Sequence, residues 1–155
     1  MATTPASIAE FLQGRRIVVA GVSQNPKSLA NALFNKLKTS GYDVVPMNPK
    51  GGEVEGVRCA PDLASIQGAI DGVFAVTPPR AGADLVRQCS ARGVKRIWFH
   101  RSFGQGSVSR EAIAEAEKRG ITCIAGACPM MFCEPVDVGH KCIRWWMKVT
   151  HKLPQ

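Results

Sequence analysis

Residues 16–28, RIVVAGVSQNPKS, combine an apolar β-branched run, a glycine and a polar loop that carries one lysine. The apolar run predicts a strand, the glycine a tight turn, and the segment after Ser28 a helix. A helix that begins here offers unpaired backbone N–H groups and the positive end of its dipole to an anion, and Lys27 adds a full charge. The segment therefore predicts a phosphate-binding loop at residues 21–28.

A nucleoside triphosphatase loop is excluded by one residue. The pattern Gly21-x4-Pro26-Lys27-Ser28 has proline where such a loop has its second glycine. Proline has a fixed φ and no N–H, so it cannot help to curl backbone donors around a phosphate. The third apolar run also lacks a terminal aspartate that would help to hold Mg²⁺.

The residues after the second and third apolar runs indicate which phosphate compound fits. The second run ends Met47-Asn48-Pro49-Lys50, and a lysine stands where NAD requires an acidic residue. This favours a ligand with a phosphorylated ribose, NADP or coenzyme A. The third run ends Thr77-Pro78-Pro79, a rigid wall that would suit an adenine or a pantetheine arm and favours coenzyme A. The simpler interpretation is that the two prolines only end the strand.

Apolar runs alternate with helical patterns along the whole chain. We expect strands at 16–21, 43–47, 72–77, 96–100 and 121–125, and helices at 29–39, 81–92, 107–119 (capped by Ser107) and 136–151. Continuous apolar strands that alternate with helices predict an α/β fold. We expect a single domain with its core at about residues 8–150: a Rossmann-like, doubly wound parallel sheet of five strands, ordered 3-2-1-4-5. Ligands of such sheets bind at the carboxyl ends of the strands.

The bulk composition narrows the possible partners. The chain has 155 residues, a formal net charge of +8, six cysteines and no run long enough to span a membrane. Because the start does not look like a secretory signal, we expect a cytoplasmic protein with reduced thiols. The basic residues are spread out and are not interleaved with aromatic ones, which favours a small anionic ligand over nucleic acid.

Four segments together, VAGVSQNPKS, VVPMNPK, VTPP and ACPMM, each after a predicted strand, resemble the stand-alone CoA-binding domain proteins. These are similar to the N-terminal domain of the succinyl-CoA synthetase α subunit. The resemblance covers roughly residues 8–150 and implies a CoA site on a Rossmann-like fold. The ligase also has a phosphohistidine domain, for which this sequence shows no counterpart, so we expect no acyl-CoA synthesis.

The resemblance also implies which residues would form the site. The loop residues would hold the diphosphate, Lys50 would lie near the 3′-phosphate, and the segments around it would border the adenosine and pantetheine. The implied binding residues are Gly21, Val22, Ser23, Pro26, Lys27, Ser28, Asn48, Pro49, Lys50, Thr77 and Pro78.

A cysteine pair follows the fifth apolar run. Cys128 and Cys133 could form a mixed disulfide with the CoA thiol, or could bind a metal together with His140. The spacing matches no common zinc pattern, so we expect no metal site and favour packing of the Pro-Met-Met turn.

The last predicted helix is amphipathic. We expect it to dock through Cys142, Trp145 and Val149, with Lys141, Arg144, Lys148 and Lys152 in solvent. Adjacent helix positions diverge by about 100°, so Trp145 and Trp146 cannot both point inward. One of them is therefore exposed or packs on another subunit, which favours a homodimer.

The sequence therefore predicts non-covalent binding of coenzyme A or an acyl-CoA, without catalysis by this chain. Two alternatives stay open. One is an NADP-dependent oxidoreductase, which the absence of a Tyr-x-x-x-Lys pair disfavours. The other is an adaptor that binds nucleic acid or protein through the basic C-terminal helix.

Overall fold

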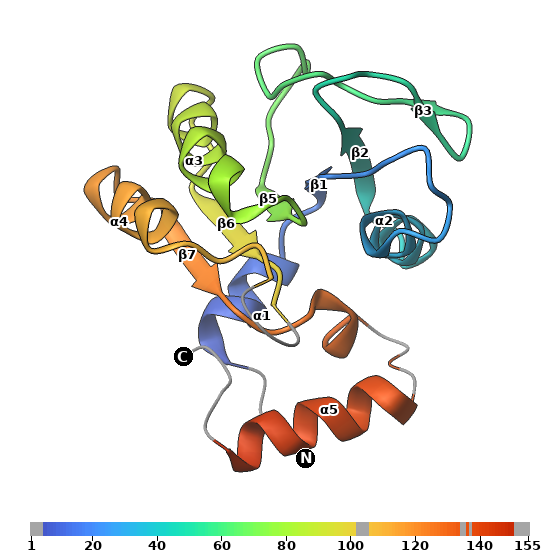
Figure 1. Cartoon of the computed structure of the whole chain (residues 1–155), viewed down its shortest axis with the longest axis vertical. Coiled ribbons are helices and arrows are strands. Elements are labelled where there is room, and N and C mark those ends of the chain that lie inside the picture. Colours follow the sequence, from blue (N-terminus) through green and yellow to red (C-terminus); the bar gives the residue numbers. More distant parts are fainter. Residues whose placement is uncertain (1–4, 102–105, 134–135, 137, 151–155) are drawn as a thin grey trace.

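The computed structural model describes residues 5–101, 106–133, 136 and 138–150. Within these residues a five-stranded parallel sheet runs in the order β2-β1-β5-β6-β7 (Figure 1). Its strands are β1 (Arg16–Ala20), β2 (Asp43–Met47), β5 (Gly72–Ala75), β6 (Arg96–Phe99) and β7 (Thr122–Ala125). A short antiparallel hairpin joins β3 (Glu53–Val54) and β4 (Val57–Arg58). The predicted class, an α/β fold on a five-stranded parallel sheet, is confirmed.

Helices connect the strands as the sequence predicted, with one addition at the start of the chain. The described helices are α1 (Ala6–Leu12), α2 (Leu29–Thr39), α3 (Gly82–Ala91), α4 (Arg110–Lys118) and α5 (Val138–Val149), with single 3₁₀ turns η1 (Pro79–Ala81) and η2 (Pro129–Met131). The sequence analysis missed α1. None of the described helices is long and apolar enough to cross a bilayer.

The sheet is covered on both faces because its side chains alternate between two hydrophobic clusters. In β1, Ile17 and Val19 pack with α1 and α2, whereas Val18 and Ala20 pack with α3 and α4 on the other side. Both faces of the strand are fully buried, which explains why the strands read as continuous apolar runs. Figure 1 shows α3 and α4 side by side on their face of the sheet.

The predicted strand order, 3-2-1-4-5, is wrong. The third long strand, β5, pairs with β1 and not with β2, so the order in the prediction's own numbering is 2-1-3-4-5. The connection from β2 to β5 crosses from the α2 face to the opposite face, where Leu63, Ile66 and Ile70 join the cluster of α3 and α4. The direction of winding therefore reverses between β1 and β5, which is where ligands bind in sheets of this order.

Pro46 marks β2 as an edge strand. The N–H of Asp43 bonds to Arg15 and the carbonyl of Met47 accepts from Gly21, so these residues turn their polar groups toward β1. Pro46, between them, turns its ring nitrogen away from β1. A proline there costs no ladder bond, whereas a strand paired on both sides would lose one. This signal was in the sequence and contradicts a central position for the second strand.

Two helix details also differ from prediction. The N-cap of α4 is Ser109, whose hydroxyl accepts the N–H of Ala112, and not Ser107, which is buried at the turn before it. The predicted docking face of α5 is wrong: Trp145 and Val149 are 66% and 57% exposed, and Cys142 is exposed. The helix instead docks through the buried Met147. Lys152 lies outside the described residues.

Candidate functional site

A pocket of about 350 Å³ lies where the carboxyl ends of β1, β2 and β5 meet, and the first turns of α3 form one wall. Eight of the eleven residues implied by the sequence line it: Gly21, Val22, Ser23, Asn48, Pro49, Lys50, Thr77 and Pro78. These residues come from three segments far apart in the sequence, and the parallel sheet brings them together. The pocket is within the size range of small-molecule sites, about 300–1,000 Å³.

Gly21 is required by the close approach of two strands at the pocket floor. Its φ is +104°, and a Cβ at this position would lie 2.1 Å from the carbonyl oxygen of Val76. Its N–H donates to the carbonyl of Met47 at 3.1 Å. Gly21 therefore lets the chain turn from β1 across the end of β5 while it stays bonded to β2.

The loop after Gly21 is fixed by one buried amide. Asn31, in the first turn of α2, is only 3% exposed. Its Oδ1 accepts the N–H of Ser23 at 2.9 Å, and its Nδ2 donates to the carbonyls of Ser23 at 2.8 Å and Asn25 at 3.2 Å. Because all three bonds are to loop backbone, Asn31 determines where the loop lies relative to the helix that follows it.

Asn48 joins two sides of the pocket. Its Nδ2 donates to the carbonyl of Val22 at 2.8 Å, and its Oδ1 accepts the N–H of Lys50 at 2.8 Å. The first bond connects the β2 end to the β1–α2 loop, and the second holds the turn that carries Lys50. Asn48, which the resemblance placed beside the adenosine, is thus also a structural link.

The remaining three implied residues lie beside the pocket and do not line it. Pro26 and Lys27 are exposed, and the N–H of Lys27 donates to Asn25 Oδ1 at 3.0 Å. The Ser28 hydroxyl accepts the N–H of Asn31 and so caps α2. In the described chain the first-turn N–H groups of Leu29 and Ala30 have no protein acceptor, so they stay available to an anion.

The sequence analysis missed the wall that η1 and α3 provide. The added residues are Ala81 in η1 and Asp84, Leu85 and Gln88 in α3, together with Met47 at the end of β2. Asp84 accepts a 2.9 Å hydrogen bond from Gln88, whose own Oε1 accepts the N–H of Leu63 at 3.1 Å. The signal was the helical spacing of residues 81, 84, 85 and 88, which share one helix face. With the wrong strand order, nothing placed that face at the switch point.

The hydroxyl of Thr77, at the pocket floor, is a polar group without a hydrogen-bond partner among the described residues. Its Oγ1 is buried. A buried hydroxyl without a partner is unfavourable, so a ligand atom or a water that bonds to it would stabilise the site.

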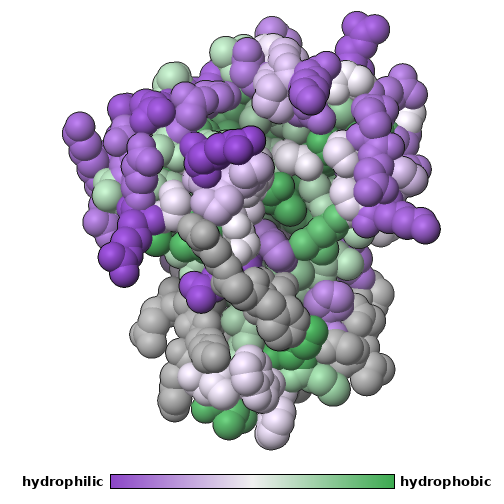
Figure 2. Space-filling model, in the orientation of Figure 1, coloured by the Kyte–Doolittle hydropathy of each residue, from purple (hydrophilic) through white to green (hydrophobic). Residues whose placement is uncertain are grey.

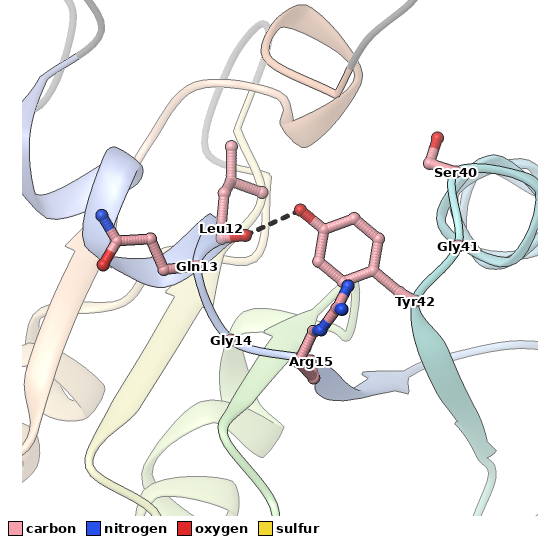
Figure 3. A pocket seen from close by; sticks show the side chains of 7 residues that line it. All are labelled: Leu12, Gln13, Gly14, Arg15, Ser40, Gly41 and Tyr42. Carbon is pink, nitrogen blue, oxygen red and sulfur yellow. Dashed lines mark hydrogen bonds between the residues drawn. The ribbon is translucent and has the colours of Figure 1, made fainter.

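A second, smaller pocket of about 220 Å³ lies at the opposite end of the sheet, between residues 12–15 and residues 40–42 (Figure 3). The side chain of Tyr42 spans this pocket, and its hydroxyl donates to the carbonyl of Leu12 at 2.8 Å. Burial raises the pKa of Tyr42, so this hydroxyl stays a neutral donor. The pocket lies between the carboxyl ends of α1 and α2, whose dipoles disfavour an anion.

The cysteine pair does not reach the ligand pocket. Cys128 and Cys133 are 2% and 4% exposed and belong to the core cluster on the α2 face, and neither forms a disulfide. This placement favours packing over redox work. Within the described residues no group of three His, Cys, Asp or Glu side chains could hold a metal ion.

The fold and the pocket define a class: a doubly wound α/β domain with a ligand-sized pocket at its topological switch point. The family is then given by sequence. The family model of the CoA binding domain matches residues 15–134, and the chain belongs to this family. The resemblance stated from the four strand-end segments is therefore confirmed.

Relatives include both short proteins and parts of ligases. An uncharacterized protein of Bacillus subtilis, YneT, is 28% identical over 124 residues, which are 79% of this chain and 89% of the relative. The α subunit of acetate–CoA ligase [ADP-forming] II of Pyrococcus furiosus is 30% identical over 125 residues, 76% of this chain but only 27% of the relative. The chain thus spans about a quarter of that ligase subunit.

Solved structures agree with the fold. A hypothetical protein from Pyrococcus horikoshii OT3 superposes with a TM-score of 0.75 at 30% identity, covering 88% of this chain and 98% of that one. A PH1109 protein redesigned for binding gives a TM-score of 0.73 at 27% identity, with 80% and 84% covered.

Proposed function

We propose that this protein binds coenzyme A or an acyl-CoA non-covalently in the pocket between β1, β2, β5 and α3, without catalysis of its own. One observation carries the proposal: eight of the residues that the family resemblance implies line one pocket at the carboxyl ends of the strands. Membership of the CoA-binding domain family, on which that resemblance rests, agrees with it.

The charges of the site suit the anionic half of the ligand. The diphosphate binds at the start of α2, where the N–H groups of Leu29 and Ala30 and the positive helix end favour an anion. Lys27 adds charge from the loop. Lys50, on the turn fixed by Asn48, takes the 3′-phosphate of the ribose.

The apolar walls suit the adenine. Pro49 and Pro78 face the pocket from two strand ends, and Leu85 closes it from α3. Prolines have no N–H and few conformations, so they form a rigid surface for a flat ring. The pocket takes the nucleotide end of the ligand, and the pantetheine arm leaves along the surface.

Three finer expectations accompany the proposal. A homodimer and a cytoplasmic location stay predictions, as does the lack of catalysis. The Pyrococcus furiosus relative is named as a subunit of an acetate–CoA ligase and is almost four times as long as its aligned part, and we do not extend the ligase activity to this chain.

Calorimetric titration of the reduced protein with CoA, dephospho-CoA, NADP⁺ and NAD⁺ tests the proposal. We expect one-site binding of CoA, weaker binding of dephospho-CoA, and no binding of the nicotinamide cofactors. Absence of CoA binding, or tighter binding of NADP⁺, would refute it.

A charge-neutral substitution tests Lys50 separately. Lys50→Gln should weaken CoA about 10- to 150-fold, as expected for the loss of one charge-assisted hydrogen bond, and leave dephospho-CoA nearly unchanged. The matched control is Lys95→Gln, an exposed lysine before β6 and away from the pocket. Equal losses for both ligands would disprove the 3′-phosphate role of Lys50.

A further inference from the structure

The helix α5 is apolar on two opposite faces. On the inner face Met147 is 5% exposed, and Ile143 packs against the core cluster. The Arg144 guanidinium also faces inward, because it donates to the carbonyl of Met131 at 2.9 Å and lies 5.6 Å from the Phe132 ring centroid. The face that carries Trp145 and Val149 is therefore left to the outside.

This outer face concentrates the exposed apolar surface of the described chain. In the described chain the exposed large hydrophobic side chains are Leu29, Trp145, Trp146 and Val149, and the last three lie within five residues of α5. We call the exposed row of Cys142, Trp145 and Val149 the stripe; Cys142 lies about one turn before Trp145. Figure 2 shows hydrophobic side chains at the lower end of the molecule, where α5 lies in Figure 1. Single exposed apolar residues need no explanation, but a cluster indicates a binding surface.

The charges next to the stripe are all of one sign. The sequence of α5, VGHKCIRWWMKV, contains three basic residues and no acidic one. Lys141 and Lys148 are exposed and seven residues apart, so they lie on the same side of the helix, next to the stripe. The partner of this face must therefore combine an apolar layer with negative charge.

A second copy of the chain, which the sequence analysis favoured as the partner of the exposed tryptophan, fits these features poorly. From the exposed fractions, Trp145, Trp146 and Val149 offer roughly 350 Å² of accessible surface, if about 250 Å² is taken for a whole tryptophan. A stable interface needs about 800 Å² from each partner. An antiparallel pair of α5 helices would also bring the lysine flanks together.

An anionic lipid surface fits all three features. Tryptophan prefers the boundary between headgroups and acyl chains, lysine reaches the lipid phosphates, and binding to a bilayer adds electrostatic attraction to whatever apolar area is buried. We propose that the outer face of α5 binds the surface of an anionic lipid bilayer, with Trp145 and Val149 at the acyl boundary and Lys141 and Lys148 on the phosphates. None of the described side chains of α5, at residues 140–149, lines the ligand pocket, so ligand and bilayer can be bound together.

Co-sedimentation with phosphatidylcholine vesicles, with and without phosphatidylglycerol, tests the proposal, and tryptophan fluorescence reports insertion. Trp98 is fully buried, so a blue shift on vesicle addition comes from α5. We expect binding to the anionic vesicles only. The double variant Lys141→Gln/Lys148→Gln should bind about thirtyfold more weakly, since each lysine near an anionic surface contributes about fivefold.

Two further variants distinguish binding through this face from non-specific adsorption to vesicles. Trp145→Ser/Val149→Ser removes the stripe at exposed positions, so it should fold normally and lose vesicle binding at least tenfold. Leu29→Ser, a matched exposed apolar residue on α2, should bind vesicles like the unsubstituted protein. If the unsubstituted protein does not bind anionic vesicles, or if the stripe variant binds them as well as the unsubstituted protein does, the proposal is overturned. Self-association that the stripe substitutions abolish would assign the face to a second copy instead.

Discussion

Replacing Gly21 by alanine tests how the pocket floor is built. The new Cβ would lie 2.1 Å from the oxygen and 2.7 Å from the carbon of the Val76 carbonyl, and this is backbone that cannot rotate away. Relief requires the backbone at Gly21 to move away from the end of β5, which strains two bonds: Val76 N–H to Ala20 at 2.9 Å, on the β5 side, and Gly21 N–H to Met47 of β2 at 3.1 Å, on the other side. Loss of these two bonds costs about 2 kcal/mol, and a positive φ without glycine costs about 1–2 kcal/mol more. The total is about 3–4 kcal/mol.

Gly93→Ala is the matched control. Gly93 also has a positive φ, +70°, but a Cβ there would have nothing within 4 Å. It should therefore show only the conformational cost of about 1–2 kcal/mol, and the entropy that alanine removes from the unfolded chain is common to both variants. The difference between the two variants, about 2 kcal/mol, isolates the contact with Val76.

Urea unfolding followed by circular dichroism measures this difference, thermal unfolding gives the midpoint temperature, and CoA titration measures the effect on the site. Gly21→Ala should lower the midpoint temperature by about 10 °C in a domain of this size and weaken CoA at least tenfold, whereas Gly93→Ala should bind CoA normally. If the two variants unfold with free energies within about 0.5 kcal/mol of each other, the close approach at Gly21 does not determine the pocket floor.

Three other predictions follow from buried amides, carboxylates and thiols. Asn31→Ala should lower the free energy of unfolding by about 2–3 kcal/mol, because it removes three part-buried hydrogen bonds to the loop backbone. Asn35→Ala on the same helix should cost under about 0.5 kcal/mol, and equal effects in urea unfolding would contradict this. The N–H groups of Arg16 and Arg15 hold the pKa of Asp71 below its usual value of 3.8. Because this pKa is lower in the folded state than in the unfolded state, the ionised carboxylate stabilises the folded protein at any pH above the unfolded-state pKa. The stability that Asp71→Asn loses at pH 7 should therefore vanish as the pH falls through the folded-state pKa. A loss that does not depend on pH would disprove this role of Asp71. A thiol reagent should modify the exposed Cys142 first and Cys89, whose pKa burial raises to about 12, only on unfolding, as peptide mass spectrometry can check.

Local chemistry explains which parts of the fold were predictable. The range 29–39 predicted for the first long helix is the observed α2, because Ser28 caps its start and apolar residues recur along one face. The helix α1 was missed because seven residues carry too little periodicity to predict a helix. It forms because Phe11 packs on Phe74 and Trp98, at ring distances of 4.6 Å and 5.6 Å, and those partners lie far away in sequence.

Long-range choices explain the errors. Strand order depends on which side of β1 the chain crosses to, and of the residues in β2 only Pro46 carried that information. For α5, periodicity identified an amphipathic helix, but with apolar residues on two faces it could not tell which one meets the core. In the structure the face that carries Met147 and Arg144 packs against the core. The site residues on β1, β2 and β5 were predictable because short motifs follow each strand, whereas the α3 wall has no such motif.

Pro46 also affects how these molecules behave at high concentration. An outer strand normally offers a row of free N–H and C=O groups on which another chain can add as a new strand, and this is a common start of aggregation. At the carboxyl end of β2 the carbonyl of Pro46 accepts the N–H of Ala60, and the N–H of Asn48 donates back to Ala60, both at 2.9 Å. The proline itself offers no donor. The carboxyl end of this edge is therefore closed to templated strand growth, and concentrated protein should resist amyloid-like assembly from the end of β2 nearest the pocket.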